Sequence, residues 1–124
     1  MSQQPRLAAL STAVPPYPLD QDDVRARARH LFDRPEAELD RLMAIYENAG
    51  IRRRYSCVPI DWYGGEIGWK KRNTLYEHHA LELIAEAAER ALAQADLPAE
   101  AIDAIVTVST TGIATPSLDA RLMN

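Results

Sequence analysis

Apolar residues recur every three or four positions in three stretches of the chain, and this spacing predicts three helices. The first runs from about residue 20 to residue 32 and opens with an acidic turn, which suits the positive end of the helix dipole. The second runs from Pro35, which is favourable at a first helical position, to the Asn-Ala-Gly stop at residues 48–50. The third is longer, starts at Asn73 or Thr74 and ends at residue 95.

Two short apolar runs predict strands. Residues 7–14 are small and apolar, and they end at a Pro-Pro-Tyr-Pro sequence whose prolines lack the amide protons that a ladder needs. Residues 102–109 contain an Ile-Val-Thr-Val run that is typical of a strand buried on both faces. A strand, several helices and a second strand indicate an α/β arrangement.

Residues 51–71 show no periodicity, and we expect an ordered but irregular segment there. Thr115-Pro116 predicts the start of a fourth helix, which Asn124 interrupts in its first turns. Two strands make too small a sheet to bury both faces. We therefore expect residues 1–124 to be part of one larger α/β domain.

Composition is that of an ordinary globular protein, with 47% hydrophobic and 26% charged residues. The net charge of -4 argues against nucleic acid or an anionic membrane as a partner.

Residues 1–6 do not have the pattern of a signal peptide, and no apolar run approaches the roughly 20 residues that span a bilayer, so we expect a cytoplasmic protein. The single cysteine, Cys57, excludes an internal disulfide and cysteine-based metal sites.

The most informative segment is residues 109–119, which follow the second predicted strand. Thr110, Thr111 and Thr115 lie where α/β folds open their ligand crevices, and Gly112 would let a substrate approach the backbone. Two interpretations stay open from spacing alone. The hydroxyl groups line a substrate pocket, or they only satisfy backbone groups of a turn.

Several motifs together resemble type III polyketide synthases, the chalcone/stilbene synthase family. The motifs are spread over nearly the whole chain and occur in the same order as in the family. The most specific of them is the glycine-proline-aspartate run after the second predicted strand. Trp69, Arg72 and Tyr76 resemble bacterial more than plant members. The other matching segments are Thr12-Ala13-Val14-Pro15-Pro16, Ile51-Arg52-Arg53-Arg54-Tyr55, Val58-Pro59-Ile60-Asp61-Trp62-Tyr63 and the run from Ser109 to Asn124.

The resemblance implies the N-terminal part of a thiolase-like fold, a layered α-β-α arrangement that is incomplete in this chain, and a homodimer. It also implies a decarboxylative condensation of malonyl-CoA onto a starter acyl-CoA, with CoA thioesters as substrates and no cofactor. The family's catalytic cysteine, histidine and asparagine would lie beyond Asn124. We therefore expect the parent protein to be an acyltransferase, and this chain to hold no catalytic residue and to be inactive alone.

The resemblance implies substrate-binding roles for individual residues that match the family's motifs. Thr110 and Thr111 match pocket positions, and Thr115 matches the residue that reaches across the dimer into the partner's cavity. Arg41 matches one basic residue that contacts the CoA phosphates. The two other basic positions align with Ala44 and Asn48, which carry no charge, so CoA docking must differ or use Arg52, Arg53 or Arg54. For this arginine run, a solvated or salt-bridged role is the alternative.

Other candidate residues are assigned no chemistry from the sequence. Cys57 follows a basic run but lies in the wrong motif for a nucleophile. His78 and His79 are adjacent and should point about 100° apart on a helix, while His78 with Glu82 lacks a third ligand, so no metal site is expected.

Two alternatives remain for the whole protein. One is a ketoacyl-carrier-protein synthase, which shares the thiolase fold. The other is a non-catalytic module that dimerises with and regulates a full-length subunit. The starter acyl group, the number of extensions and the ring closure depend on a cavity that this sequence does not define.

Overall fold

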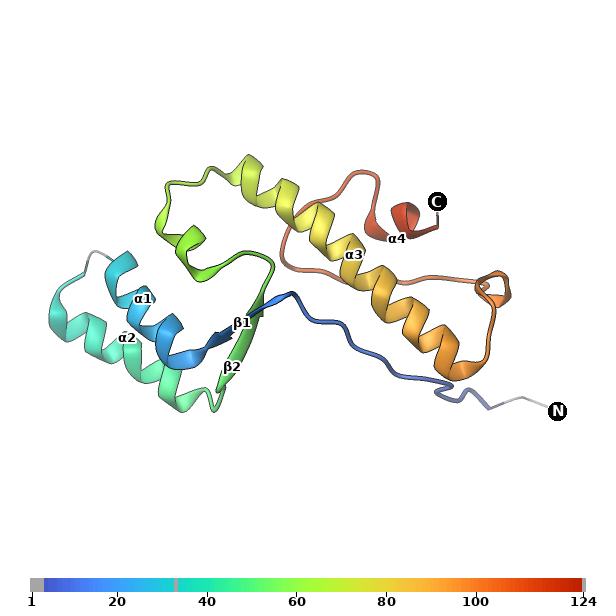
Figure 1. Ribbon diagram of the computed structural model, residues 1–124, viewed down its shortest axis with the longest axis horizontal. Helices are drawn as coiled ribbons and strands as arrows, with labels where there is room; N and C mark the ends of the chain where they lie inside the picture. Colours follow the sequence, from blue (N-terminus) through green and yellow to red (C-terminus); the bar gives the residue numbers. More distant parts are fainter. Residues whose placement is uncertain (1–3, 33, 124) are drawn as a thin grey trace. The chain divides into compact units, whose positions relative to one another are not determined.

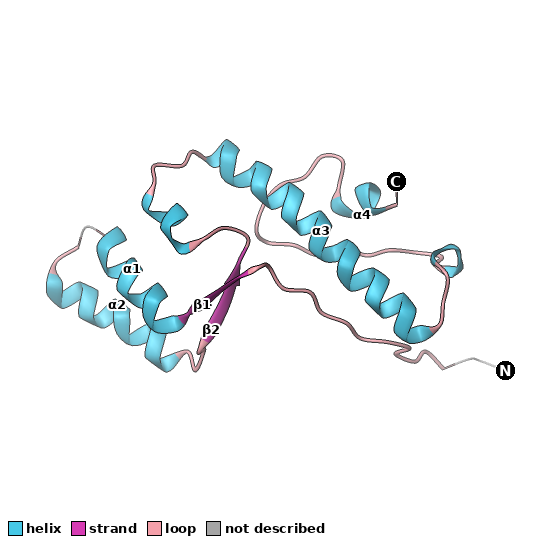
Figure 2. Ribbon diagram, viewed as in Figure 1, coloured by secondary structure: helices cyan, strands magenta, loops and turns pink. Residues whose placement is uncertain are grey.

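A computed structural model describes residues 4–32 and 34–123, and the predictions that involve residues 1–3 and Asn124 lie outside this part. The chain forms two compact units, which are described separately (Figure 1). One unit is Val14–Glu66, and the other combines Met1–Ala13 with Ile67–Asn124. The described helices and strands are drawn by type in Figure 2.

The Val14–Glu66 unit contains two helices beside a two-stranded sheet. Its elements in chain order are β1 (Tyr17–Asp20), α1 (Gln21–Leu31), α2 (Glu36–Asn48), β2 (Arg53–Ser56) and the 3-10 helix η1 (Ile60–Gly64). The first two predicted helices are therefore confirmed within one to two residues at each end. Gly50, at φ +65°, follows α2 in the left-handed conformation that glycine adopts readily.

The strand predicted over residues 7–14 is wrong. The structure instead places β1 at Tyr17–Asp20, antiparallel to β2, with Tyr17 opposite Ser56 and Pro18 opposite Tyr55. A two-stranded sheet consists of edges only, so Pro18 can sit in it with the side that lacks an amide proton unpaired. The β2 strand lies in the segment that was expected to be irregular.

Gln21 connects three elements of this unit. Its side chain is buried at 7% exposure, and its Nε2 donates to the Tyr46 carbonyl oxygen of α2 at 3.0 Å. Its Oε1 accepts from Nε of Arg54 in β2 at 2.9 Å, and its backbone N–H donates to the carbonyl oxygen of Arg52 at 3.0 Å. The start of α1 is thus held to both α2 and the region of β2.

The other unit is built on α3 (Trp69–Ala95), with η2 (Ala99–Ala101) and α4 (Leu118–Leu122) after it. The long third helix is confirmed, although it begins at Trp69, earlier than expected. It ends at Asp96, which takes the left-handed conformation at φ 54°. Nη1 of Arg90 donates to the Thr12 carbonyl oxygen at 2.9 Å, which attaches the N-terminal segment to this helix.

The strand predicted over residues 102–109 is also wrong for the described chain. Val106 and Val108 are 87% and 90% exposed, while Ile105 and Thr107 are half-buried. The side chains alternate as in a strand, but among residues 4–32 and 34–123 the only sheet is β1–β2, so this run has no neighbour for its backbone. The fourth helix is confirmed as α4, preceded by a cis Thr115-Pro116 bond.

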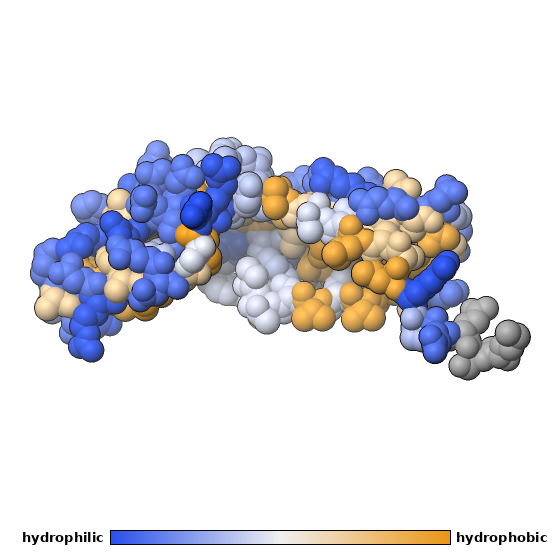
Figure 3. All heavy atoms as spheres, turned by 90° about the horizontal axis from the view of Figure 1, so that it is seen from below, coloured by the Kyte–Doolittle hydropathy of each residue, from blue (hydrophilic) through white to orange (hydrophobic). Residues whose placement is uncertain are grey.

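Apolar side chains remain at the surface of the unit that contains α3. Leu7 and Leu10 are 80% and 75% exposed and Ile113 is 63% exposed, in addition to the two valines. In the view of Figure 3, apolar residues gather mainly on the part of the surface that this unit forms. Large exposed apolar patches are typical of surfaces that contact protein, membrane or ligand. None of the described helices is long and apolar enough to cross a membrane.

Replacing Gln21 with Ala should lower the free energy of unfolding by about 1–2 kcal/mol, because the Arg54 guanidinium and the Tyr46 carbonyl lose their shared partner in a half-buried position. Urea unfolding of the complete gene product that contains this sequence measures the effect. The matched control is Gln94→Ala, an exposed glutamine in α3, whose effect should stay within about 0.5 kcal/mol. Equal effects of the two substitutions would contradict the role assigned to Gln21.

Candidate functional site

The loop after the exposed apolar run is held against the first turns of α3 by side-chain hydrogen bonds. Nδ2 of Asn73 donates to the Ile113 carbonyl oxygen at 2.8 Å, and Oδ1 of Asn73 accepts from the Ile113 backbone N–H at 2.9 Å. The Tyr76 hydroxyl group bonds the Ser109 hydroxyl oxygen at 2.8 Å. A side-chain amide therefore satisfies both backbone groups of Ile113, as a neighbouring strand would.

Gly112 is required by this contact between the loop and α3. A Cβ atom at Gly112 would lie 2.3 Å from ring carbon Cδ1 of Tyr76, far inside van der Waals contact. The sequence suggested that this glycine admits a substrate to the backbone. In the structure the space beside it is filled by the Tyr76 ring, so packing against α3 explains the glycine.

The structure brings the three predicted threonines together on this loop. Thr110, Thr111 and Thr115 are all exposed, and within the described residues none of their hydroxyl groups has a hydrogen-bond partner. The turn is instead stabilised by the Ser109 hydroxyl oxygen, which accepts from the Thr111 backbone N–H at 3.3 Å. The threonine hydroxyl groups are thus not consumed by the turn and are free to contact a ligand.

Arg121 of α4 fixes the second half of the loop. Its Nη2 donates to the Thr115 carbonyl oxygen at 3.2 Å and its Nε to the Pro116 carbonyl oxygen at 3.0 Å. Its Nη2 also lies 3.6 Å from Oε1 of Glu77 on α3. The loop is therefore held from both helices of the unit.

Asp119 joins the exposed apolar run to α4. Its Oδ1 accepts from the Thr107 hydroxyl at 3.2 Å. Hydrogen bonds from the Ser117 hydroxyl, then from the backbone N–H at the start of α4 and from Thr107, hold the pKa of Asp119 below its ordinary value. The carboxylate stays charged near neutral pH, where it suits the positive end of the short helix.

Arg41 belongs to the Val14–Glu66 unit. It is exposed on α2 and lines a shallow depression of about 370 Å³ with Arg34, Glu38 and Leu42. Arg34 forms an ion pair with Glu38 at 3.8 Å between Nη1 and Oε2, whereas Arg41 has no ion-pair partner among the described residues. The Arg41 guanidinium is therefore available to an anionic ligand.

The arginine run at residues 52–54 is largely engaged by the protein itself. Nε of Arg53 lies 3.4 Å from Oδ1 of Asp20, and Arg54 donates to Gln21. Arg52 lines a depression that also holds the acidic side chains of Asp20, Asp22 and Glu47. These carboxylates disfavour a phosphate there, so the salt-bridged interpretation of the run fits the structure better.

The same unit contains a larger groove of about 690 Å³ between α1, α2 and β2. It is mainly apolar and its polar lining residues include Arg27, Arg34, Arg54 and Ser56. Cys57 is half-buried and does not line this groove. The structure thus gives no support to Cys57 as a nucleophile.

Two residues of the site escaped sequence reasoning. The sequence indicates Asn73 only as a possible helix cap and Tyr76 only as part of a motif. Their polar groups meet partners 33 and 40 positions away, at Ser109 and Ile113. No local pattern encodes contacts of that separation.

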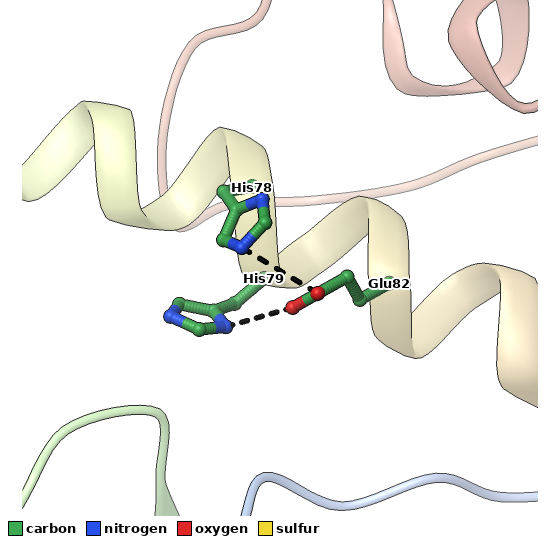
Figure 4. A group of neighbouring side chains, drawn as sticks. All are labelled: His78, His79 and Glu82. Atoms are coloured by element: carbon green, nitrogen blue, oxygen red, sulfur yellow. Dashed lines mark hydrogen bonds and ion pairs between the residues drawn. The ribbon is translucent and has the colours of Figure 1, made fainter.

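The sequence predicts that the adjacent His78 and His79 point apart, and the structure places their rings close together. Their ring centroids are 4.8 Å apart, and one ring nitrogen of each lies near the Glu82 carboxylate (Figure 4). His79 thus lies where a third group beside His78 and Glu82 would be needed.

No family model matches the chain. It is 38% identical over 116 residues to 1,3,6,8-tetrahydroxynaphthalene synthase of Streptomyces peucetius subsp. caesius. The aligned region covers 94% of this chain and 31% of that protein. The crystal structure of the synthase of the same name from Streptomyces coelicolor A3(2), a bacterial type III polyketide synthase, matches with a TM-score of 0.78 and 35% identity, over 94% of this chain and 34% of that one. PKS-I of the brown alga Ectocarpus siliculosus matches with a TM-score of 0.76 and 28% identity, over 94% and 35%.

These matches confirm the resemblance to type III polyketide synthases and the α/β, thiolase-like fold class. The chain spans about a third of the length of the relatives that it matches. The loop of Thr110, Thr111 and Thr115 thus lies in a chain that is similar to type III polyketide synthases over nearly all of its own length.

Replacing Gly112 with Ala should destabilise the unit by about 1–3 kcal/mol, the usual cost of forcing extra atoms into a packed contact. The melting temperature of the complete gene product measures the effect. Tyr76→Ala in the same molecule should remove most of the additional loss, because the clashing ring is gone. Gly68→Ala is the matched control, since nothing lies within 4 Å of a Cβ atom there.

Proposed function

We propose that this chain is the N-terminal portion of a type III polyketide synthase, within a single thiolase-like domain that includes residues 1–124. The observation that supports the proposal most is the loop that α3 clamps, in a chain similar to a tetrahydroxynaphthalene synthase over 94% of its length. The hydroxyl groups of its three threonines have no hydrogen-bond partner among residues 4–32 and 34–123. The substrates would be acyl-CoA and malonyl-CoA, with no separate cofactor. We place the enzyme in the cytoplasm.

The proposed reaction needs groups that this chain does not supply. A cysteine thiolate attacks the thioester of the starter acyl-CoA and releases CoA as the thiolate. Malonyl-CoA then loses CO2, and its enolate attacks the acyl-enzyme carbonyl to form a carbon–carbon bond while the cysteine leaves. Donors in an oxyanion-hole arrangement stabilise the enolate. All of these catalytic groups belong to the rest of the protein.

The residues of this chain would shape the substrate cavity and bind the substrates, and would not take part in the bond-making steps. Thr110 and Thr111 would form part of the wall around the growing polyketide. Thr115 would reach across a homodimer into the partner's cavity. Arg41 would contact the CoA phosphates, because its guanidinium is exposed and unpaired among the described residues.

The direct test is to incubate the complete gene product with malonyl-CoA and a starter acyl-CoA in the absence of any carrier protein. We expect a carbon–carbon bond, one CO2 and one CoA released per extension. A strict requirement for acyl carrier protein would instead identify a ketoacyl-carrier-protein synthase. No turnover under either condition, together with co-purification of a full-length synthase subunit, would identify a non-catalytic module.

Replacing Arg41 with Ala should raise the apparent KM for malonyl-CoA by roughly tenfold, the effect of about 1.4 kcal/mol from one lost charged contact, and leave kcat nearly unchanged. Steady-state kinetics on the complete gene product measures this. Arg6→Ala, which removes the same charge from another exposed position, is the control and should change neither constant. An unchanged KM for Arg41→Ala would remove this residue from the CoA site.

A further inference from the structure

We propose that His78, His79 and Glu82 on α3 form a binding site for one divalent transition-metal ion of the zinc class. One ligand atom from each side chain lies within 4.8 Å of the others (Figure 4). The proposal does not depend on the polyketide synthase function, because it rests on the three side chains alone.

The two adjacent histidines reach one point because they use different ring nitrogens. Nε2 of His78 lies 3.4 Å from Oε1 of Glu82, and Nδ1 of His79 lies 3.0 Å from Oε2 of the same carboxylate. Nε2 is the far nitrogen of the ring and Nδ1 the near one. Neighbouring positions on a helix are rotated by about 100°. His78 reaches the Glu82 carboxylate with its far nitrogen and His79 with its near nitrogen, so both rings contact it in spite of this rotation.

Helix geometry places the carboxylate between the two rings. Glu82 is four residues after His78 and three after His79, the two spacings at which side chains on a helix are neighbours. Each carboxylate oxygen faces one imidazole nitrogen, as Figure 4 shows. The three groups are thus already directed toward a common centre by a single regular helix.

The donor set selects the kind of ion. Two imidazole nitrogens and one carboxylate suit Zn²⁺, Cu²⁺ or Ni²⁺, whereas Mg²⁺ and Ca²⁺ prefer all-oxygen sites. Ligands around a tetrahedral ion with bonds of about 2.1 Å lie about 3.4 Å apart. The ligand atoms here lie within 4.8 Å of one another, so the widest separation must shorten by up to about 1.4 Å. The side chains of His78 and Glu82 are 63% and 58% exposed and can make this adjustment.

Three protein ligands leave a coordination position for water or for a further group. Zinc sites with three protein ligands and one open position are common, while purely structural sites usually have four. Because two of the three side chains are well exposed, water can complete the coordination shell. The site therefore binds a metal ion that remains accessible to exchange.

The test is a titration with Zn²⁺ on the complete, untagged gene product after metal has been removed with a chelator. A chromophoric chelator reports the free ion. We expect the unaltered protein to bind one more Zn²⁺ per chain than the His78→Ala/His79→Ala variant, and an excess of Mg²⁺ should not displace that ion. His30→Ala, which removes the remaining, exposed histidine of this chain, is the matched control and should keep the stoichiometry.

Co²⁺ provides an independent spectroscopic readout, because its visible absorption reports the coordinating groups. Glu82→Gln keeps the size of the side chain and removes its charge, so it should weaken binding at least tenfold even if the double histidine variant does not fold. Equal Zn²⁺ stoichiometry and affinity in the unaltered protein and in Glu82→Gln would overturn the proposal. Displacement by Mg²⁺ at similar concentration would overturn the assignment to a transition metal.

Discussion

The pair of hydrogen bonds between the Asn73 side chain and the backbone of Ile113 is the constraint on which the candidate site depends. The loop that carries the threonines follows a run that has no neighbouring strand among the described residues, so it lacks the ladder that normally fixes such a loop. The side-chain amide of Asn73 makes the two hydrogen bonds that one residue of a neighbouring strand would make with Ile113. Tyr76 strengthens the contact by its bond to Ser109 and by the close fit of its ring against Gly112.

The helix α3 therefore carries both the residues that hold the threonine loop and the histidine–glutamate cluster. Asn73 and Tyr76 are three residues apart and lie on the same side of α3, which faces the loop. The cluster of His78, His79 and Glu82 occupies the next turns of the same helix. A regular helix holds side chains at fixed spacing without help from the rest of the fold, so both groups are positioned by local geometry.

The exposed apolar residues and the similarity to longer proteins support one physical picture. Val106 and Val108 alternate with half-buried neighbours, as in a strand, yet are almost fully exposed. Such surface costs free energy in water, and a parallel sheet covers both faces of its strands. The chain spans about a third of its relatives, and further protein of the same fold would supply the missing neighbours.

The sequence by itself determined the four helices, the α/β class, the resemblance to polyketide synthases and the threonine loop, because helical periodicity, caps and motifs are local properties of the chain. Only the tertiary structure decided where the strands lie, that Asn73 and Tyr76 clamp the loop, and that Gly112 is needed for packing. Strand pairing and these contacts join residues more than 30 positions apart. The convergence of His78 and His79 on Glu82 was missed for another reason: it depends on side-chain rotamers and on the choice of ring nitrogen, which spacing alone does not specify.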